Sequence, residues 1–351
     1  MNRILPISLP QFNLKDKTKI GVAVVGLGVG VQHAKAYYRL DDCSLHWLYD
    51  LDSFKASEIA SALGEVRVAH SFQQILEDKD VQIISIASYD SAHFEQIVAS
   101  LKSGKHVFVE KPICHTLNEL KTIKETWSQS QKKLKLSSNL VLRAAPLYQW
   151  LREKIKSGDS GEIYAFDGDY LYGRLHKITR GWRKTEENYS VMLGGGIHLI
   201  DLMLWLTNEK PLTVQAVGNN ICTQDTNFNY NDYVSALLTF PNGLIGRITA
   251  NFGCVHQHQH VIRIFGTHAT FIYDDSGPRL HQTRDPMLSA SQVHYSALSE
   301  TKGDLIPPFV DAVIRDIDWD QHTQNMFDVI SVCLACEAAV TSNSLQEIEY
   351  I

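Results

Sequence analysis

The chain has 351 residues, of which 44% are hydrophobic and 21% are charged, and this balance is typical of a globular protein rather than of a disordered or fibrous one. Its formal net charge of −6 gives no indication of a broad basic surface for nucleic acid. The length is sufficient for two ordinary domains, each with its own core.

The N-terminal segment and the cysteines favour an intracellular protein. Residues 1–19 mix prolines with charged residues and lack the apolar segment and small-residue cleavage site of a signal peptide. No apolar run approaches the roughly 20 residues that a membrane helix needs. Cys333 and Cys336 have C-x-x-C spacing, but they lie in the apolar run Val329–Val340, which favours a helix core over a metal or redox site. We expect a cytoplasmic protein without a membrane or nucleic-acid partner.

Short apolar runs alternate with stretches of helical spacing over residues 19–138. The first run, Lys19–Gly26, is rich in β-branched residues and ends in glycine, as expected of a buried parallel strand. Further predicted strands are Leu45–Tyr49, Val66–Ala69, Val81–Ala87 and His106–Val109. The alternation predicts an α/β domain with a doubly wound parallel sheet of the Rossmann type, preceded by an extension at residues 1–18.

A glycine-rich turn follows the first strand and opens a helix. Gly26, Gly28, Val29 and Gly30 allow a tight turn and a close approach of the backbone to a pyrophosphate, whose charge a helix N-terminus favours. Asp50, 22 residues beyond Gly28, ends the second strand, where a carboxylate bonds ribose hydroxyls and repels a 2′-phosphate. The pattern predicts an NAD site. The alternative is a structural turn with a surface aspartate.

The turn departs from the usual G-x-G-x-x-G fingerprint, because its third glycine comes one residue early and Val31 takes the standard position. Either the turn is one residue shorter than usual, or Val31 packs where glycine normally allows close contact between helix and strand. Both alternatives leave the cofactor site in place.

From Asn139 onward the pattern changes to longer strands with alternating hydrophobicity. They are Glu162–Leu171, Leu212–Asn219, Tyr233–Phe240, Leu244–Asn251 and Val261–Tyr273. The dipeptide Asn242-Gly243 between two of these strands is a strong hairpin signal. Residues 139–351 are therefore predicted to form a second α/β domain with a large, mostly antiparallel open sheet backed by helices. A last helix, at about 325–340, is expected to pack on either domain.

Four segments resemble the glucose–fructose oxidoreductase / inositol dehydrogenase (Gfo/Idh/MocA) family, and the resemblance extends over about residues 20–351. Gly104–Pro112 is similar to the family's G-K-H-V-x-x-E-K-P signature, and Ser88–His93 to its T-P-N-x-x-H segment, with tyrosine in place of proline. Asn139 and Arg143–Pro146 resemble a strand end followed by R-x-x-P, and Gly194–Asp201 resembles D-x-G-x-H-x-x-D.

The resemblance implies hydride transfer between NAD(H) and a secondary alcohol or ketone of a sugar or a nucleotide-linked sugar. It also implies that the second domain binds this substrate and forms a homodimer or homotetramer through its open sheet. Beyond the glycine turn and Asp50, the cofactor-binding residues that it implies are Ser88, Tyr89, His93, Glu110, Lys111, Asn139 and Arg143.

Lys111 and His198 are the catalytic pair that the resemblance implies. A lysine just past the end of a strand can accept a hydroxyl proton if burial and cofactor charge lower its pKa, and histidine suits a proton relay. Many members carry an aspartate where this chain has Gly194; relatives that act on nucleotide-linked sugars lack it too, which favours that substrate class. Asp201, one helical turn beyond His198, either orients the ring or caps the helix. The competing hypothesis is a dinucleotide-binding sensor or scaffold that has lost catalysis.

Cations and aromatic side chains gather in one segment of the second domain. We predict that four residues of this segment bind substrate: Tyr172, Arg174, Trp182 and Arg183. Lys111, His198 and Asp201 are the other candidate substrate-binding residues. Together the four residues of the segment suit a phosphate with a sugar or a base that stacks. The alternative is a solvated basic loop.

His256, His258 and His260 alternate, so that on a strand all three would share one face. Three imidazoles on one face can bind zinc or nickel. Because no acid or cysteine clusters with them, we expect instead that they line the exposed or subunit-facing side of the open sheet, and we predict no metal.

Overall fold

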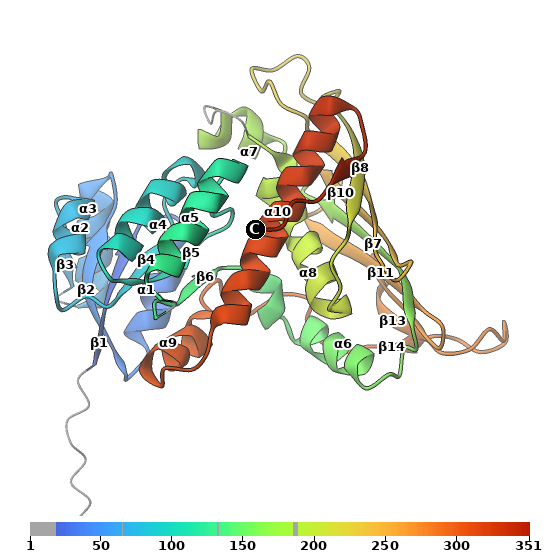
Figure 1. Cartoon of the computed structure of the whole chain (residues 1–351), viewed down its shortest axis with the longest axis horizontal. Coiled ribbons are helices and arrows are strands. Elements are labelled where there is room, and N and C mark those ends of the chain that lie inside the picture. Colours follow the sequence, from blue (N-terminus) through green and yellow to red (C-terminus); the bar gives the residue numbers. More distant parts are fainter. Residues whose placement is uncertain (1–18, 65, 132, 185–188) are drawn as a thin grey trace, which may run out of the picture.

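The computed structural model describes residues 19–64, 66–131, 133–184 and 189–351, so the predicted extension at residues 1–18 lies outside the described residues. Two sheets with their helices lie side by side, and the long helix α10 (Asp320–Ser342) runs between them (Figure 1). The first sheet belongs to the N-terminal half of the chain and the second to the C-terminal half.

The first half contains a six-stranded parallel sheet in the order β3-β2-β1-β4-β5-β6. Its strands are β1 (Ile20–Val25), β2 (Cys43–Tyr49), β3 (Arg67–Val68), β4 (Ile83–Ile86), β5 (His106–Val109) and β6 (Leu136–Ser138). The helices between them are α1 (Gly30–Tyr38), α2 (Ser53–Leu63), α3 (Phe72–Glu77), α4 (His93–Lys102) and α5 (Leu117–Gln129). This order confirms the predicted doubly wound sheet, whose central strands are apolar because both of their faces are buried.

Side-chain caps fix where several of these helices begin. The Asp52 carboxylate accepts a hydrogen bond from the backbone N–H of Lys55 ahead of α2, and Ser71 caps α3 in the same way. Thr116 and Glu119 form a reciprocal capping box at the start of α5. Each such cap contributes about 1 kcal/mol to helix stability, so the turns at the carboxyl edge of the sheet have defined positions.

The second half contains a nine-stranded sheet in the order β14-β13-β12-β11-β7-β10-β9-β8-β15. Only β7 and β10 pair in parallel, which confirms the predicted, mostly antiparallel sheet. The strands are β7 (Ile163–Leu171), β8 (Thr213–Asn219), β9 (Tyr233–Thr239), β10 (Ile245–Asn251), β11 (Gln259–Gly266), β12 (Thr270–Asp274), β13 (Gly277–His281), β14 (Ser291–Gln292) and β15 (Gln346–Glu347). The helices of this half are α6 (Pro146–Lys156), α7 (His176–Thr179), α8 (Ile197–Thr207), α9 (Ile306–Ile314) and α10.

One predicted strand, Val261–Tyr273, is in fact two strands. The chain turns back between β11 and β12, which pair in an antiparallel hairpin. The break falls at Gly266, where an added Cβ would lie 2.1 Å from the carbonyl oxygen of Ser160. The segment lacks the Asn-Gly or Pro signals that mark a turn, so its apolar pattern looks continuous in the sequence.

The last two helices return the chain to the first half. α9 packs against α1 and β5, and α10 contacts α5 and β6 on one side and α8 and β8 on the other. Among the described residues, α10 is the one helix long and apolar enough to cross a membrane, and more than half of its apolar stretch is buried within the protein. Cys333 and Cys336 lie in α10, where both are buried and unpaired, as predicted for a helix core.

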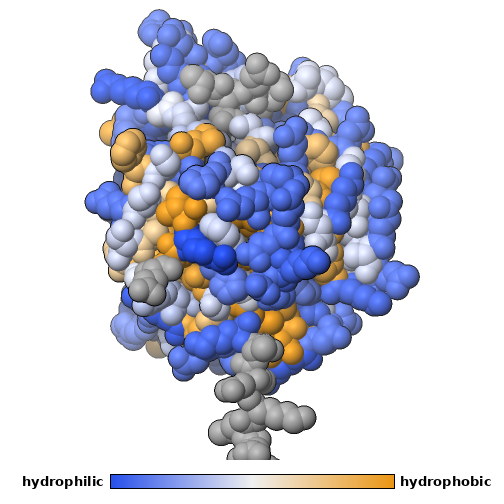
Figure 2. Space-filling view, turned by 90° about the vertical axis from the view of Figure 1, so that its left-hand side faces the viewer, coloured by the Kyte–Doolittle hydropathy of each residue, from blue (hydrophilic) through white to orange (hydrophobic). Residues whose placement is uncertain are grey.

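The face presented by the first half carries mostly hydrophilic residues with small apolar groups scattered among them (Figure 2). Several large side chains of this half, such as Tyr37, Phe108 and Ile83, are fully buried, whereas Phe54 is exposed. The hydrophobic residues of the alternating pattern therefore form the core, as the strand and helix periodicities predict.

Candidate active site

A cavity of about 860 Å³ lies between the two halves, at the carboxyl ends of β1, β4 and β5. This is the edge at which an open α/β sheet binds its ligands. Both halves contribute to its lining. The lining residues include Gly26, Gly28, Val29, Asp50, Ser88, Tyr89, Asp90, Glu110, Lys111 and Asn139 from the first half, and Tyr170, Tyr172, Arg174, Trp182, Arg183, His198, His258, His260 and Lys302 from the second.

The glycine turn has the backbone that a dinucleotide needs. Gly26 has φ of +81°, and an added Cβ there would lie 2.4 Å from the carbonyl oxygen of Ala87. Space around Gly28 is open, so that a pyrophosphate can approach the backbone. Gly30 begins α1, and its Cβ would lie 3.1 Å from Ala87 Cβ and 3.3 Å from Val24 Cγ1. Gly30 thus allows the close contact between helix and strand, and the turn is one residue shorter than usual.

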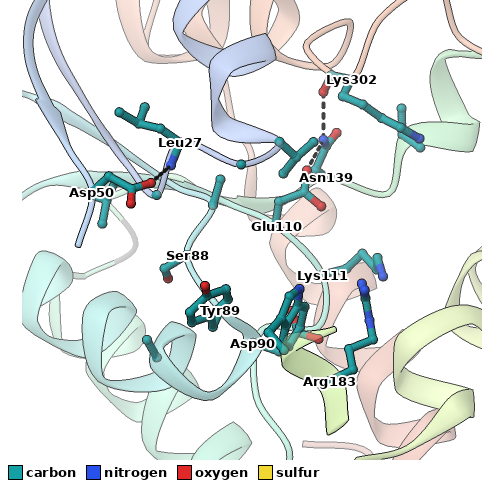
Figure 3. A pocket seen from close by; sticks show the side chains of 18 of the residues that line it. Leu27, Asp50, Ser88, Tyr89, Asp90, Glu110, Lys111, Asn139, Arg183 and Lys302 are labelled. Carbon is teal, nitrogen blue, oxygen red and sulfur yellow. Dashed lines mark hydrogen bonds between the residues drawn. The ribbon is translucent and has the colours of Figure 1, made fainter. Parts of the chain in front are cut away.

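Asp50 is held in place at the other side of this turn (Figure 3). Its carboxylate accepts hydrogen bonds from the backbone N–H of Leu27 at 2.6 Å and of Asp52 at 3.0 Å, and from Lys55 Nζ at 3.3 Å. Partial burial acts to raise the pKa of Asp50, but these hydrogen bonds and the Lys55 charge lower it overall. The cavity therefore presents an ionised carboxylate where a ribose would lie.

Glu110 and Asn139 form a hydrogen-bond network at the wall of the cavity. Asn139 Nδ2 donates to Glu110 Oε1 at 2.7 Å and to the backbone oxygen of Lys302 at 2.8 Å, and His33 Nε2 lies 3.1 Å from the same carboxylate. Burial opposes ionisation, yet the hydrogen bonds and charges of His33, Asn139 and Lys111 lower the pKa of Glu110 to about 2. The network fixes the loop that carries Lys302 against the first half.

Of the two predicted cofactor contacts at the start of the Ser88–His93 segment and the one at its end, the first two line the cavity and the last does not. Ser88 and Tyr89 line it, and the Tyr89 ring stacks on Trp182 of the second half with 5.1 Å between ring centroids. His93 is fully buried, with Nδ1 2.6 Å from the carbonyl oxygen of Pro112 and Nε2 3.2 Å from that of Ser88. His93 thus joins the loops that follow β4 and β5, and it positions cavity residues rather than lining the cavity.

Lys111 projects into the cavity beside Asp90 and Arg183 (Figure 3). Its Nζ donates a hydrogen bond to the carbonyl oxygen of Gly194 at 2.7 Å, which links the two halves. Burial lowers the pKa of Lys111, the Asp90 charge opposes this, and the Arg183 charge adds to it. A lysine whose pKa is lowered is suited to accept a proton.

His198, at the start of α8, also lines the cavity, and its Nδ1 is buried without a hydrogen-bond partner. Burial and the neighbouring positive charge of Lys111 lower the pKa of His198 well below its usual value, so the ring is neutral near pH 7. A neutral imidazole can both donate and accept a hydrogen bond.

Gly194 lies in a π-helical turn, Met192–Gly196, that leads into α8. An added Cβ at Gly194 would lie 2.4 Å from the hydroxyl oxygen of Tyr189, which is itself buried. The hydroxyl of Tyr189 therefore fills the space that an aspartate at this position would need.

Arg143 and Asp201 bind each other and do not line the cavity. Arg143 Nε donates to both carboxylate oxygens of Asp201, at 3.0 and 3.1 Å. Burial raises the pKa of Asp201, and the Arg143 charge opposes that rise. The sequence suggests two roles for Asp201, orienting His198 or capping the helix. The observed partner of its carboxylate is Arg143 instead. The predicted contact of Arg143 with cofactor and that of Asp201 with substrate are not seen in the lining.

The four candidate residues of the basic aromatic segment all line the cavity. The Arg183 guanidinium lies over the Trp182 ring at 4.4 Å, and that of Arg174 over the Tyr172 ring at 5.7 Å. These pairs bring positive charge and aromatic surface to the side of the cavity formed by the second half.

The expectation for the three alternating histidines is wrong for two of them. His258 and His260 line the cavity, whereas His256 contacts Asp275 outside it. The reason is strand pairing: His260 lies opposite Tyr170 of β7, on the sheet face that packs against α8. Among the described residues, no group of three or more His, Cys, Asp or Glu side chains is placed to hold a metal ion.

Three other residues of the site were not among the residues predicted from the sequence. Asp90 lines the cavity within the Ser88–His93 segment, and Lys302 lines it from a stretch without a distinctive pattern. His33 does not line the cavity but contacts Glu110 from an ordinary helix face. Only the pairing of segments distant in sequence brings them together.

Comparison with known proteins places both halves in one family. Residues 20–138 match the family model described as oxidoreductase family, NAD-binding Rossmann fold, and residues 148–272 match that of the GFO/IDH/MocA C-terminal domain. Myo-inositol 2-dehydrogenase from Thermotoga maritima is 24% identical over 262 residues, covering 72% of this chain and 75% of that protein. An uncharacterized oxidoreductase from Synechocystis sp. is 26% identical over 189 residues, and the match spans 53% of this chain and only half of that protein.

The fold also matches solved structures over nearly its whole length. Levoglucosan dehydrogenase, solved in complex with NADH and levoglucosan, superposes with a TM-score of 0.79 at 18% sequence identity, covering 94% of this chain and 99% of that chain. At this identity the likeness shows the fold, while the two family models show the relationship. The chain belongs to the GFO/IDH/MocA family of NAD-binding oxidoreductases.

Proposed function

We propose that the protein is an NAD(H)-dependent dehydrogenase or reductase that acts on a secondary alcohol or ketone of a sugar, nucleotide-linked sugars included. One observation carries the proposal. Lys111 from the first half and His198 from the second line a single cavity, which continues to the glycine turn and Asp50. The basic aromatic segment lines the same cavity and supports a phosphate-bearing substrate.

The bound dinucleotide would supply the hydride acceptor or donor at its nicotinamide. The turn at Gly26, the open space at Gly28 and the ionised Asp50 fit its pyrophosphate and ribose. Lys111, oriented by the Gly194 carbonyl, takes the proton of the reacting hydroxyl during oxidation and returns it during reduction. His198 holds the same hydroxyl by a hydrogen bond from its neutral ring.

A turnover screen tests this function. With NAD⁺, a panel of sugars, inositols and nucleotide-linked sugars is expected to contain at least one substrate, detected by the absorbance of NADH. His198→Ala should lower kcat for that substrate by about tenfold to a hundredfold while leaving the affinity for NADH unchanged, because His198 comes from the second half. If wild type and variant bind NADH alike and neither turns over any panel member, the sensor hypothesis becomes the better account.

Asp50 should make the protein prefer NAD(H) to NADP(H). Its carboxylate, ionised and fixed by Leu27 and Lys55, would repel a 2′-phosphate. Calorimetric titration should show tighter binding of NADH than of NADPH by about tenfold or more, the effect of a like-charge contact worth about 1.4 kcal/mol. Asp50→Ser should reduce this preference, because it also frees Lys55 to pair with the phosphate. Equal or tighter NADPH binding by the wild type would remove Asp50 from this role.

Two further features stay predictions of the sequence. They are the cytoplasmic location and self-association through the open sheet.

A further inference from the structure

Three imidazole rings meet at the side of the cavity formed by the second half. The ring centroids of His258 and His260 are 5.0 Å apart, and those of His198 and His260 are 5.9 Å apart. His198 Nδ1, His258 Nε2 and His260 Nε2 are all buried without a hydrogen-bond partner. Buried polar atoms are rarely left unpaired in a protein. Three of them on residues that line one cavity therefore indicate a site for a polar ligand.

Positive charges surround these rings. Burial is the largest cause that lowers the pKa of His258 to about 4 and that of His260 to about 3, and the charge of Lys302 lowers both further. Arg174 and Lys111 also act on His258, while Lys111, Lys302, His258 and His260 act on His198. Both rings of the pair His258–His260 are thus neutral at pH 7, and each is ready to accept a proton if a negative charge comes near.

The positive charges of Arg174 and Lys302 have no carboxylate partner in the part of the chain that the structure describes. Among the described residues, no ion pair joins Arg174 or Lys302 to a carboxylate. Three carboxylates line the cavity: Asp50 beside the glycine turn, Glu110 bonded to His33 and Asn139, and Asp90 facing Lys111 and Arg183. Among the described residues, the side that holds the histidines therefore carries more positive than negative charge, and an anionic ligand can pair with it.

We propose that the substrate is an anionic sugar, whose carboxylate or phosphate is bound by His258, His260, Lys302 and Arg174. The proposal rests on the proposed function, because it places this anion beside the reacting hydroxyl held by Lys111 and His198. Lys302 and Arg174 pair with the negative charge, and the two histidines donate hydrogen bonds to it. A neutral polyol would leave the positive charges unbalanced and bind more weakly.

Matched sugars test the charge requirement directly. Glucose, glucuronate and glucose 6-phosphate, and the same three forms of galactose, are compared by kcat/KM with NAD⁺ and by calorimetric binding to the protein–NADH complex. At least one anionic form should exceed its neutral parent by about tenfold or more in both measurements, as expected for a charge-assisted contact. Comparing the sugar acid with the sugar phosphate shows which of the two anions the site binds. Neutral sugars that bind or react as well as their acids would overturn the proposal.

Variants show whether these residues are responsible. Lys302→Met and Arg174→Met should each weaken binding of the preferred anion by about tenfold, with little change for its neutral parent. Lys177→Met is the matched control, since Lys177 is exposed and does not line the cavity. Equal losses for anion and neutral sugar would show a merely structural role. Turnover of neutral sugars alone would contradict the proposed anion site and leave the proposed function intact. Binding of anionic sugars without turnover of any sugar would support the anion site and contradict the proposed function.

The histidine pair adds a second readout. An anion beside His258 and His260 raises the pKa of both rings, so the complex binds more protons than the free enzyme just above the free pKa values, at about pH 4 to 5.5. Calorimetry in buffers of different ionisation enthalpy should therefore show proton uptake on binding of the anionic sugar. His258→Gln should reduce this uptake. Binding without proton uptake, with affinity unchanged between about pH 4 and 6, would remove the histidines from the site.

Discussion

Replacing Lys111 with alanine is expected to lower kcat by about 10² to 10⁴-fold, the range of a positioned general acid or base, while the protein stays folded. Lys111 combines burial, a lowered pKa and a hydrogen bond to Gly194 that aims its Nζ into the cavity. The measurement is steady-state turnover of the best substrate, with circular dichroism to follow the fold.

Lys102→Ala serves as the control, because Lys102 is an exposed residue at the end of α4. This variant should keep the wild-type kcat. Near-normal turnover by Lys111→Ala would exclude Lys111 as the proton acceptor. A large loss of NADH affinity in that variant, with kcat unchanged, would assign it to cofactor binding alone.

Introducing the family's aspartate at Gly194 is expected to damage the protein rather than improve it. The new Cβ would lie 2.4 Å from the hydroxyl oxygen of Tyr189, and a carboxylate would be buried beside it. Overpacking together with a buried charge should lower the free energy of unfolding by about 2 to 4 kcal/mol. Thermal and denaturant unfolding of Gly194→Asp would measure this loss, and kcat should fall because the turn also holds Lys111.

The double variant Gly194→Asp/Tyr189→Phe tests whether the contact with the Tyr189 hydroxyl causes the loss of stability. Removal of the hydroxyl relieves the closest contact but leaves the ring carbon that carries it 3.0 Å from the Cβ, so part of the stability should return. A Gly194→Asp protein as stable as the wild type and with a higher kcat would show that Tyr189 does not fill this space.

Local sequence patterns predict the elements well but not which face a side chain adopts. The strands of the first sheet follow from short β-branched runs, because both faces of each strand are buried and the run alone marks it. Alternation in the sequence predicts that His258 and His260 share a side, yet only the pairing of β11 with β7 decides that the side of His260 meets α8. The same limit applies to Arg143 and Asp201, whose contact joins segments 58 residues apart.

Motif spacing predicts residues at the end of a strand better than residues in loops. Gly26 and Asp50 are predicted because they end the first two strands of a parallel sheet, whose strand ends meet at one edge. Glu110 and Lys111 are predicted because Gly104–Pro112 resembles a family signature, and all four residues line the cavity. Lys302 comes from an irregular segment between β14 and α9, and its place depends on the hydrogen bond from Asn139 to its backbone. The hydrophobic periodicity of the sequence does not predict the position of Lys302.

Helix α10 packs against both halves of the molecule and so restricts movement of one half relative to the other. It packs on α5 and β6 of the first half and on α8 and β8 of the second, and Thr323 Oγ1 donates to the backbone oxygen of Leu136 at 2.8 Å. Because this single helix contacts both halves, moving one half away from the other would break the contacts of α10 with one of them. The spacing between Lys111 and His198 is therefore set when the chain folds, and ligand binding need not provide the energy to bring the two side chains together.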